Sequence, residues 1–252
     1  MKDALQTFGA ALGALQSELD WELLGRCACE GDGSDFYDTQ LRERILDTGL
    51  RLAEDIGRAL GEAPGRSLYL GAEVAELPLV LAEQIVLGRR VDWLNLECEQ
   101  TRELARAIRV VGERQSVELP LPRALELSHI EAGSCNHLWM VSVLTDPDHF
   151  PALHDELYER RSGPLATGRG SLEEDRERAQ ALIELLLTRA APECVLSTSD
   201  EERGLIEPLA ARSGWTLHFA PGGRISAVVG DRVRIGKLRR AGGRGGSMQR
   251  RS

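Results

Sequence analysis

Long apolar runs and aromatic residues are the features that this sequence lacks or has least of. No segment approaches the ~20 consecutive apolar residues that a membrane-spanning helix requires, and aromatic side chains make up only 4% of the 252 residues. Hydrophobic residues still amount to 42%, so we expect a sizeable core built mainly from aliphatic side chains. The first segment, MKDALQTFGAALGALQSELDW, places acidic residues on both sides of a short apolar run, which disfavours a cleavable signal peptide. We therefore expect a cytoplasmic protein without a membrane partner.

Cysteine usage argues against two further classes of protein. The sequence has five cysteines, an odd number, scattered at Cys27, Cys29, Cys98, Cys135 and Cys194. Neither the count nor the spacing suits a disulfide framework. The stretch CAC lacks the CxxC spacing and the second pair that a structural zinc site needs. We expect no disulfide framework and no metal site.

Charge is distributed unevenly along the sequence. The formal net charge is −9, yet the C-terminal segment KLRRAGGRGGSMQRRS contains basic residues and no acidic ones. An acidic body does not suit a broad nucleic-acid surface. We expect residues 239–252 to be a disordered, glycine-rich basic tail. Two interpretations stay open for it: a solvated tail, or a contact for nucleic acid or an acidic partner.

Two helical segments precede the first strand. Apolar residues recur every three or four positions in residues 1–26 and again in residues 39–60, where Asp38 is positioned to cap the helix start. Between them, CEGDGSD has the glycine and aspartate residues of a loop. We expect residues 1–60 to form an N-terminal helical extension that serves either as a lid over a site or as a dimer contact.

From residue 61 to residue 238 the pattern alternates between strands and helices. Short apolar runs in SLYLG, RVDWLNL, HLWMVSVL and CVLST predict buried strands, and segments of helical periodicity lie between them. This alternation predicts an α/β fold with a doubly wound, mostly parallel, Rossmann-like sheet and helices on both faces. The segments WTLHFA and ISAVVGDRVRIGKL are separated by only a few residues, so we expect them to pair as a C-terminal antiparallel hairpin.

The order of these elements resembles that of the class I S-adenosylmethionine-dependent methyltransferases over residues 40–238. The first motif of that family, typically like LDLGAGTGEL, corresponds to LYLGAEVAEL here. The resemblance implies S-adenosylmethionine as the cofactor, with Gly71, Ala72 and Glu73 as binding residues. Tyr69 stands at the family's acidic position, and Glu73 replaces a glycine that leaves room for the cofactor. The Glu73 carboxylate either turns outward or holds the amino group of the cofactor.

Two further cofactor residues follow from the same resemblance. The family carries an acidic residue at the end of the second strand, where its oxygens accept hydrogen bonds from the ribose hydroxyls. In VDWLNLECEQTRELARA that position falls on Glu97, although a glutamate also suits the positive end of a helix dipole. The segment SDFYDTQ resembles the family's lid, with Tyr37 over the cofactor. A packed core aromatic is the other interpretation of Tyr37.

Candidate catalytic residues follow the strand HLWMVSVL, in the segment TDPDHF. Ligands of open α/β sheets bind beyond the carboxyl ends of the strands, and the resemblance places substrate-facing residues here. His149 is a candidate general base because the reference pKa of histidine lies near neutrality, and Asp146 is a candidate for orienting the nucleophile. The same segment also makes a good turn between a strand and a helix.

Methyl transfer from S-adenosylmethionine to a small-molecule acceptor is the leading functional hypothesis. The altered first motif supports an alternative, a catalytically inactive binding or scaffold protein with the same fold. A nicotinamide-dependent enzyme is disfavoured, because no G-x-G-x-x-G follows the first strand. The sequence also lacks the DPPY-like or NPPY-like signature of base methylation, which disfavours a DNA substrate.

Overall fold

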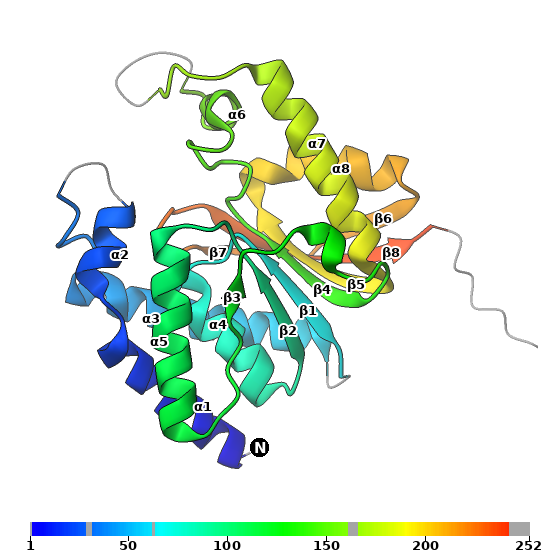
Figure 1. The fold of residues 1–252 in the computed structure, drawn as a ribbon. Coiled ribbons are helices and arrows are strands. Elements are labelled where there is room, and N and C mark those ends of the chain that lie inside the picture. Colours follow the sequence, from blue (N-terminus) through cyan, green and yellow to red (C-terminus); the bar gives the residue numbers. More distant parts are fainter. Residues whose placement is uncertain (1, 29–31, 62–63, 161–165, 242–252) are drawn as a thin grey trace, which may run out of the picture.

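The computed structural model describes residues 2–28, 32–61, 64–160 and 166–241, and one sheet forms its centre (Figure 1). The strand order is β3-β2-β1-β4-β5-β8-β6, and β7 pairs with β8 outside this path. The strands are β1 (Arg66–Leu70), β2 (Arg90–Leu94), β3 (Pro122–Arg123), β4 (Cys135–Met140), β5 (Ala190–Ser199), β6 (Trp215–Phe219), β7 (Arg224–Ile225) and β8 (Arg232–Arg240). β1 to β5 pair in parallel, whereas β8 is antiparallel to both β5 and β6. The mostly parallel sheet with antiparallel C-terminal strands is confirmed.

Helices cover both faces of the sheet, as the alternating pattern predicted (Figure 1). Tyr69 and Leu68 are neighbours in β1 but are buried in different cores, because successive side chains of a strand point to opposite faces. Helices α1, α3, α4 and α5 share a core with Tyr69, and α6, α7 and α8 share the other with Leu68. The helices are α1 (Lys2–Glu18), α2 (Trp21–Ala28), α3 (Thr39–Leu60), α4 (Leu77–Leu81), α5 (Glu99–Gln115), α6 (Pro151–Leu157), α7 (Leu172–Arg189) and α8 (Asp200–Arg212). In the described part of the chain, none of them combines the length and the apolar character that crossing a membrane requires.

The N-terminal helices belong to the same core as the sheet. Apolar residues of α1, α2 and α3 are buried together with Trp139 of the central strand β4. Helix α3 starts where the sequence predicted, since Asp38 Oδ1 accepts a hydrogen bond of 2.7 Å from the Leu41 N–H group. Helix α1 is tied to α5 by an ion pair of 2.8 Å between Glu18 and Arg106. The expected N-terminal extension is therefore an integral part of the fold.

The C-terminal segment ISAVVGDRVRIGKL forms two strands, β7 and β8, where we expected one. In the turn between them the Ser226 N–H group donates to the Asp231 carbonyl at 2.8 Å. Gly230 makes this turn possible because its φ of +88° lies in the region that favours glycine. The antiparallel pairing of β6 with β8 follows the expectation.

The expected basic tail starts later than residue 239. Strand β8 continues to Arg240, and Arg239 and Arg240 pair with Thr216 and Trp215 of β6. Pairing with β6 provides hydrogen-bond partners for the backbone N–H and C=O groups of these residues. This explains why β8 continues beyond the last apolar residue of its sequence. The remaining part of the expected tail, residues 242–252, lies outside the described residues.

A buried polar cluster lies between β1, β4 and the segment that follows α4. The chain forms a π-helix at Ala82–Val86 and thereby places the fully buried Glu83 beside the sheet. Tyr69 Oη donates to Glu83 Oε1 at 2.5 Å, the Ser67 hydroxyl donates to Oε2, and His137 Nδ1 lies 2.7 Å from Oε1. Tyr69 stands where the methyltransferase resemblance expects an acidic residue. Its hydroxyl instead donates a hydrogen bond to the carboxylate of Glu83.

Arg89 completes this cluster as the cation. Its Nε donates to Ser67 Oγ at 2.9 Å and to Glu83 Oε2 at 3.2 Å, and its side chain is 1% exposed. Burial acts to raise the pKa of Glu83, but His137 and the hydroxyl donors outweigh it and hold that pKa well below its usual range. The cluster is therefore a charged unit in which each member satisfies another.

Arg89→Leu is expected to destabilise the fold by about 3–5 kcal/mol, because it removes the buried guanidinium that binds both Glu83 and Ser67. Arg90→Leu is the matched control, since Arg90 is the next residue and its side chain is 70% exposed. We expect the control to change stability by about 0.5 kcal/mol at most. Urea unfolding monitored by circular dichroism measures both, and equal losses would contradict a structural role for the cluster.

Candidate functional site

The candidate site lies at the carboxyl ends of the parallel strands, beginning with the turn after β1. Gly71 has a φ of +68°, and its N–H group donates to the Leu94 carbonyl of β2 at 3.0 Å. A Cβ atom at Gly71 would lie only 2.8 Å from Val143 Cγ2 of the loop after β4. Glycine is therefore required here both by the backbone conformation and by the close approach of the neighbouring loop.

Ala72, the second expected cofactor residue, is fully buried and fixes this turn to β2. Its carbonyl accepts hydrogen bonds from Trp93 Nε1 at 2.8 Å and from Asn95 Nδ2 at 3.0 Å. Asn95 directly follows the last residue of β2, and its Oδ1 accepts the Leu96 N–H group at 3.0 Å. The Asn95 amide thus stabilises the turn after β1 through its hydrogen bond to Ala72. The sequence around Asn95 does not predict this contact.

Glu73 faces solvent and opens the short 3-10 helix Val74–Glu76. Its N–H group donates to Glu76 Oε2 at 2.9 Å, and its own Oε2 accepts from Gln100 Nε2 at 2.8 Å. Protein atoms around the carboxyl group raise the pKa of Glu73, the Gln100 hydrogen bond opposes this, and Asp146 adds a raising contribution from the loop after β4. The Gln100 hydrogen bond holds the Glu73 carboxyl group beside the start of α5.

Glu97 lies on the surface near the start of α5. Its side chain is 61% exposed, and Oε1 pairs with Arg102 Nη1 at 2.9 Å. The residue directly after β2 is Asn95, and Glu97 lies two positions beyond Asn95, three after the strand end. The residues VDWLNLECE do not reveal where strand β2 ends. The end of β2 determines which residue lies at the carboxyl edge of the sheet, where the cofactor's ribose is expected.

Tyr37 is a core residue. It is 2% exposed, and its ring lies 5.6 Å from that of Trp21 and 4.9 Å from that of Phe36, measured between centroids. Its carbonyl accepts a hydrogen bond of 2.6 Å from Arg42 Nε. The structure therefore places Tyr37 as a packed aromatic, the second of the two interpretations that its sequence context allowed.

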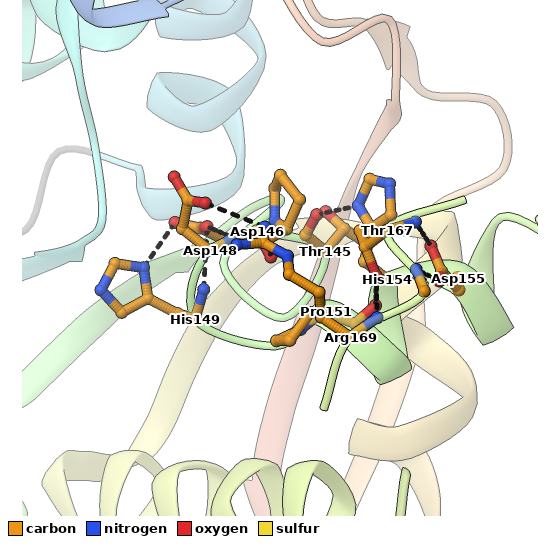
Figure 2. Close-up of polar contacts among 11 residues, drawn as sticks. Thr145, Asp146, Asp148, His149, Pro151, His154, Asp155, Thr167 and Arg169 are labelled. Atoms are coloured by element: carbon orange, nitrogen blue, oxygen red, sulfur yellow. Dashed lines mark hydrogen bonds and ion pairs between the residues drawn. The ribbon is translucent and has the colours of Figure 1, made fainter. Parts of the chain in front are cut away.

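Asp146 and His149 are brought together in the loop after β4, as Figure 2 shows. His149 Nδ1 lies 3.0 Å from Asp146 Oδ2, while Asp146 Oδ1 accepts the N–H groups of Asp148 at 2.8 Å and of His149 at 3.2 Å. When Nδ1–H donates to Asp146, Nε2 carries the lone pair that a general base needs. The same hydrogen bonds stabilise the turn into α6, as the sequence predicted, and the catalytic role of the pair stays a prediction.

A second polar group at the carboxyl ends of the strands, centred on Asp231, was not predicted from the sequence. Asp231 is 4% exposed, and both of its oxygens accept from Tyr158 Oη at 2.8 Å. Oδ2 also accepts from Ser142 Oγ at 2.7 Å. Burial raises the pKa of the Tyr158 hydroxyl above its usual range. Ser142 and Asp231 are far apart in sequence, and Asp231 stood inside a segment that was expected to be one strand.

Comparisons with known proteins establish the fold. No protein-family model matches the chain, and no curated protein matches it. The structure is similar to magnesium protoporphyrin IX methyltransferase (ChlM) from Synechocystis PCC 6803 with bound SAH, with a TM-score of 0.50 and 15% identity over 86% of this chain and 92% of that chain. The chain has the class I methyltransferase fold. The fold that the sequence resemblance implied is therefore confirmed.

Two other similar structures cover most of the chain. A SAM-dependent methyltransferase from Aquifex aeolicus has a TM-score of 0.44 and 10% identity, covering 81% of this chain and 95% of that chain. MtNAS in complex with S-adenosylmethionine has a TM-score of 0.45 and 13% identity, covering 95% of this chain and 76% of that chain.

Stability is expected to fall as the pH rises from about 4.5 to about 7, because desolvation raises the pKa of Glu76 from 4.5 to about 7. Over this range the unfolded chain releases the Glu76 proton while the folded protein retains it. Below and above the range the contribution is constant. Urea midpoints measured across it should show a smaller loss in Glu76→Gln than in the wild type. Glu118→Gln, at an exposed position, is the control and should keep the wild-type slope.

Proposed function

We propose that the chain binds S-adenosylmethionine over the turn after β1 and transfers its methyl group to a small-molecule acceptor. The observation that supports this most directly is Gly71, a left-handed glycine at the carboxyl end of a central parallel strand. Ligands of doubly wound sheets bind at such ends. ChlM, which has the same fold, has been observed with bound SAH.

The residues around the turn are compatible with this cofactor. Gly71 and Ala72 would offer bare or nearly bare backbone, and the carboxylates of Glu73 and Asp146 would complement a positively charged sulfonium and amino group. Glu97 would reach the ribose hydroxyls by leaving its exposed ion pair with Arg102. When bound, the sulfonium supplies an electrophilic methyl group, so the chain's own task is to position the acceptor in line.

Acidic groups around the site favour an acceptor that carries an amine over an anionic one. Asp146 and His149 lie together in the loop after β4, and the carboxylate of the nearly buried Asp231 accepts from the Ser142 and Tyr158 hydroxyls among its described hydrogen bonds. His149 Nε2 would remove the proton that an amine must lose, with Asp146 holding the imidazole. An anionic acceptor would meet repulsion from these carboxylates.

A non-catalytic module is the second candidate, and one observation favours it. The polar groups of the turn are engaged within the chain, with Glu73 bound to Gln100 and Asn95 bound to Ala72. These hydrogen bonds hold the turn in its conformation without a ligand. In this case the protein would keep the methyltransferase fold as a scaffold for a partner.

Isothermal titration with S-adenosylmethionine and SAH should show micromolar binding to the wild type. Gly71→Ala should weaken it about tenfold or more, because the added Cβ meets Val143 and the left-handed backbone is strained. Gly133→Ala is the matched control: Gly133 has a φ of +69°, but a Cβ there meets nothing within 4 Å. It shares the strain and should keep wild-type affinity.

Glu97→Ala tests the ribose contact separately, with the neighbouring exposed Glu99→Ala as its control. Only the first variant should lose affinity for both ligands. If the folded wild type binds neither ligand at millimolar concentration, methyl transfer is contradicted and the non-catalytic module stands.

A further inference from the structure

Val143 occupies the space directly over the turn after β1. Its Cγ2 atom approaches Gly71 so closely that a Cβ atom on the glycine would lie 2.8 Å away. Val143 itself is only partly buried, and it packs against the core that α6, α7 and α8 share. A ligand that lies against Gly71 on the side where a Cβ atom would point must share this space with the valine methyl groups.

The backbone on both sides of Val143 is held by one carboxylate. Ser142 N–H donates to Glu202 Oε2 at 3.1 Å, and Leu144 N–H donates to Glu202 Oε1 at 2.8 Å. Ser142 adopts a φ of +60°, which is uncommon for a residue other than glycine and persists only when its surroundings impose it. The two hydrogen bonds provide that restraint.

Glu202 is well suited to act as this clamp. It is fully buried at the start of α8, and Oε2 also accepts from Thr198 Oγ1 at 2.9 Å and from Ser199 Oγ at 3.1 Å. Ser199 in turn caps α8 through the Glu202 N–H group at 3.3 Å. The carboxylate is therefore fixed by α8 and the end of β5, and it transmits their position to the loop after β4.

We infer that Val143, clamped by Glu202, determines how much room a ligand has over Gly71. The inference rests on the proposed function and deepens it, because it names the side chain that limits the fit of the adenosyl cofactor. Val143 is then a specificity-determining residue, and Glu202 is a positioning residue that acts through it. Binding requires the valine methyl groups to yield, and a smaller side chain relieves that cost.

SAH binding measured by titration calorimetry on variants of the full chain tests this inference. Val143→Ala is expected to bind SAH about tenfold more tightly than the wild type, and Val143→Ile about tenfold more weakly. Val143→Thr keeps the branched shape and should stay within about twofold. Val229→Ala makes the same truncation at a residue that is 57% exposed and should leave the affinity unchanged. Thermal melts of each variant establish that it is folded.

Glu202→Gln tests the clamp. The amide retains one acceptor oxygen but turns an N–H group toward one of the two backbone N–H groups, so the loop is released on one side. SAH affinity should rise in this variant, and adding Val143→Ala should give less than the product of the two single effects. Unchanged affinity or full additivity would overturn the clamp. If Glu202→Gln fails to fold, the series at position 143 decides.

The outcomes separate this inference from the proposed function. Wild-type binding that Val143→Ala does not tighten overturns the inference and leaves the proposed function intact. Binding that is undetectable in the wild type but measurable in Val143→Ala supports the inference about Val143 and contradicts methyl transfer by the wild-type protein. Absence of binding in every folded variant overturns both.

Discussion

The parallel pairing of β1 with β4 is the constraint on which the rest of the site depends. The register places Leu70 beside Met140, so the two chains leave the sheet side by side. The glycine turn and the loop that carries Asp146 and His149 therefore face one another across a few ångströms. Two features of the site follow from that proximity: the requirement for glycine at position 71 and the position of Val143 beside it.

The buried carboxylate of Glu83 and the carboxylates at the edge of the sheet have different kinds of partner. Beneath it, Glu83 is matched by Arg89 and His137, and the cluster is part of the core. At the edge, Glu73 and Asp231 accept hydrogen bonds from neutral groups among the described contacts. A carboxylate held by amides and hydroxyls keeps its negative field available to a ligand, whereas one bound by a guanidinium does not. Under the proposed function, this contrast would favour a positively charged ligand at the site.

Local patterns predicted most of the fold, because they act over short distances in the sequence. The cap at Asp38 and the alternation of strands and helices required only neighbours. Contacts that join distant segments were not predictable in the same way. Asp231 meets Ser142 only because β8 is inserted beside β5, and Glu83 enters the core only because a π-helix turns it there.

The candidate site was predicted in part for the same reason. The pairing of Asp146 with His149 is local, and the sequence placed both at the end of the correct strand. The assignment of Glu97 depended on the residue at which β2 ends; β2 ends at Leu94, so Asn95 directly follows it and Glu97 lies two residues further on. Tyr37 could be assigned only once its neighbours Trp21 and Phe36 were known. The sequence indicates that an aromatic residue such as Tyr37 is buried, but it does not indicate whether the ring packs in the core or against a ligand.

The position of β8 has a consequence for how the protein is made. Among the residues that the structure describes, β8 follows β6 in the chain, yet it lies between β5 and β6, and it is the one strand that pairs with β6. During synthesis β6 leaves the ribosome with both of its edges unpaired, and such edges are prone to association with other chains. Closure of this part of the sheet must therefore wait for β8, even though the β1–β4 centre is synthesised earlier. The interval between the synthesis of β6 and that of β8 is when the β6 edges are most open to association with other chains.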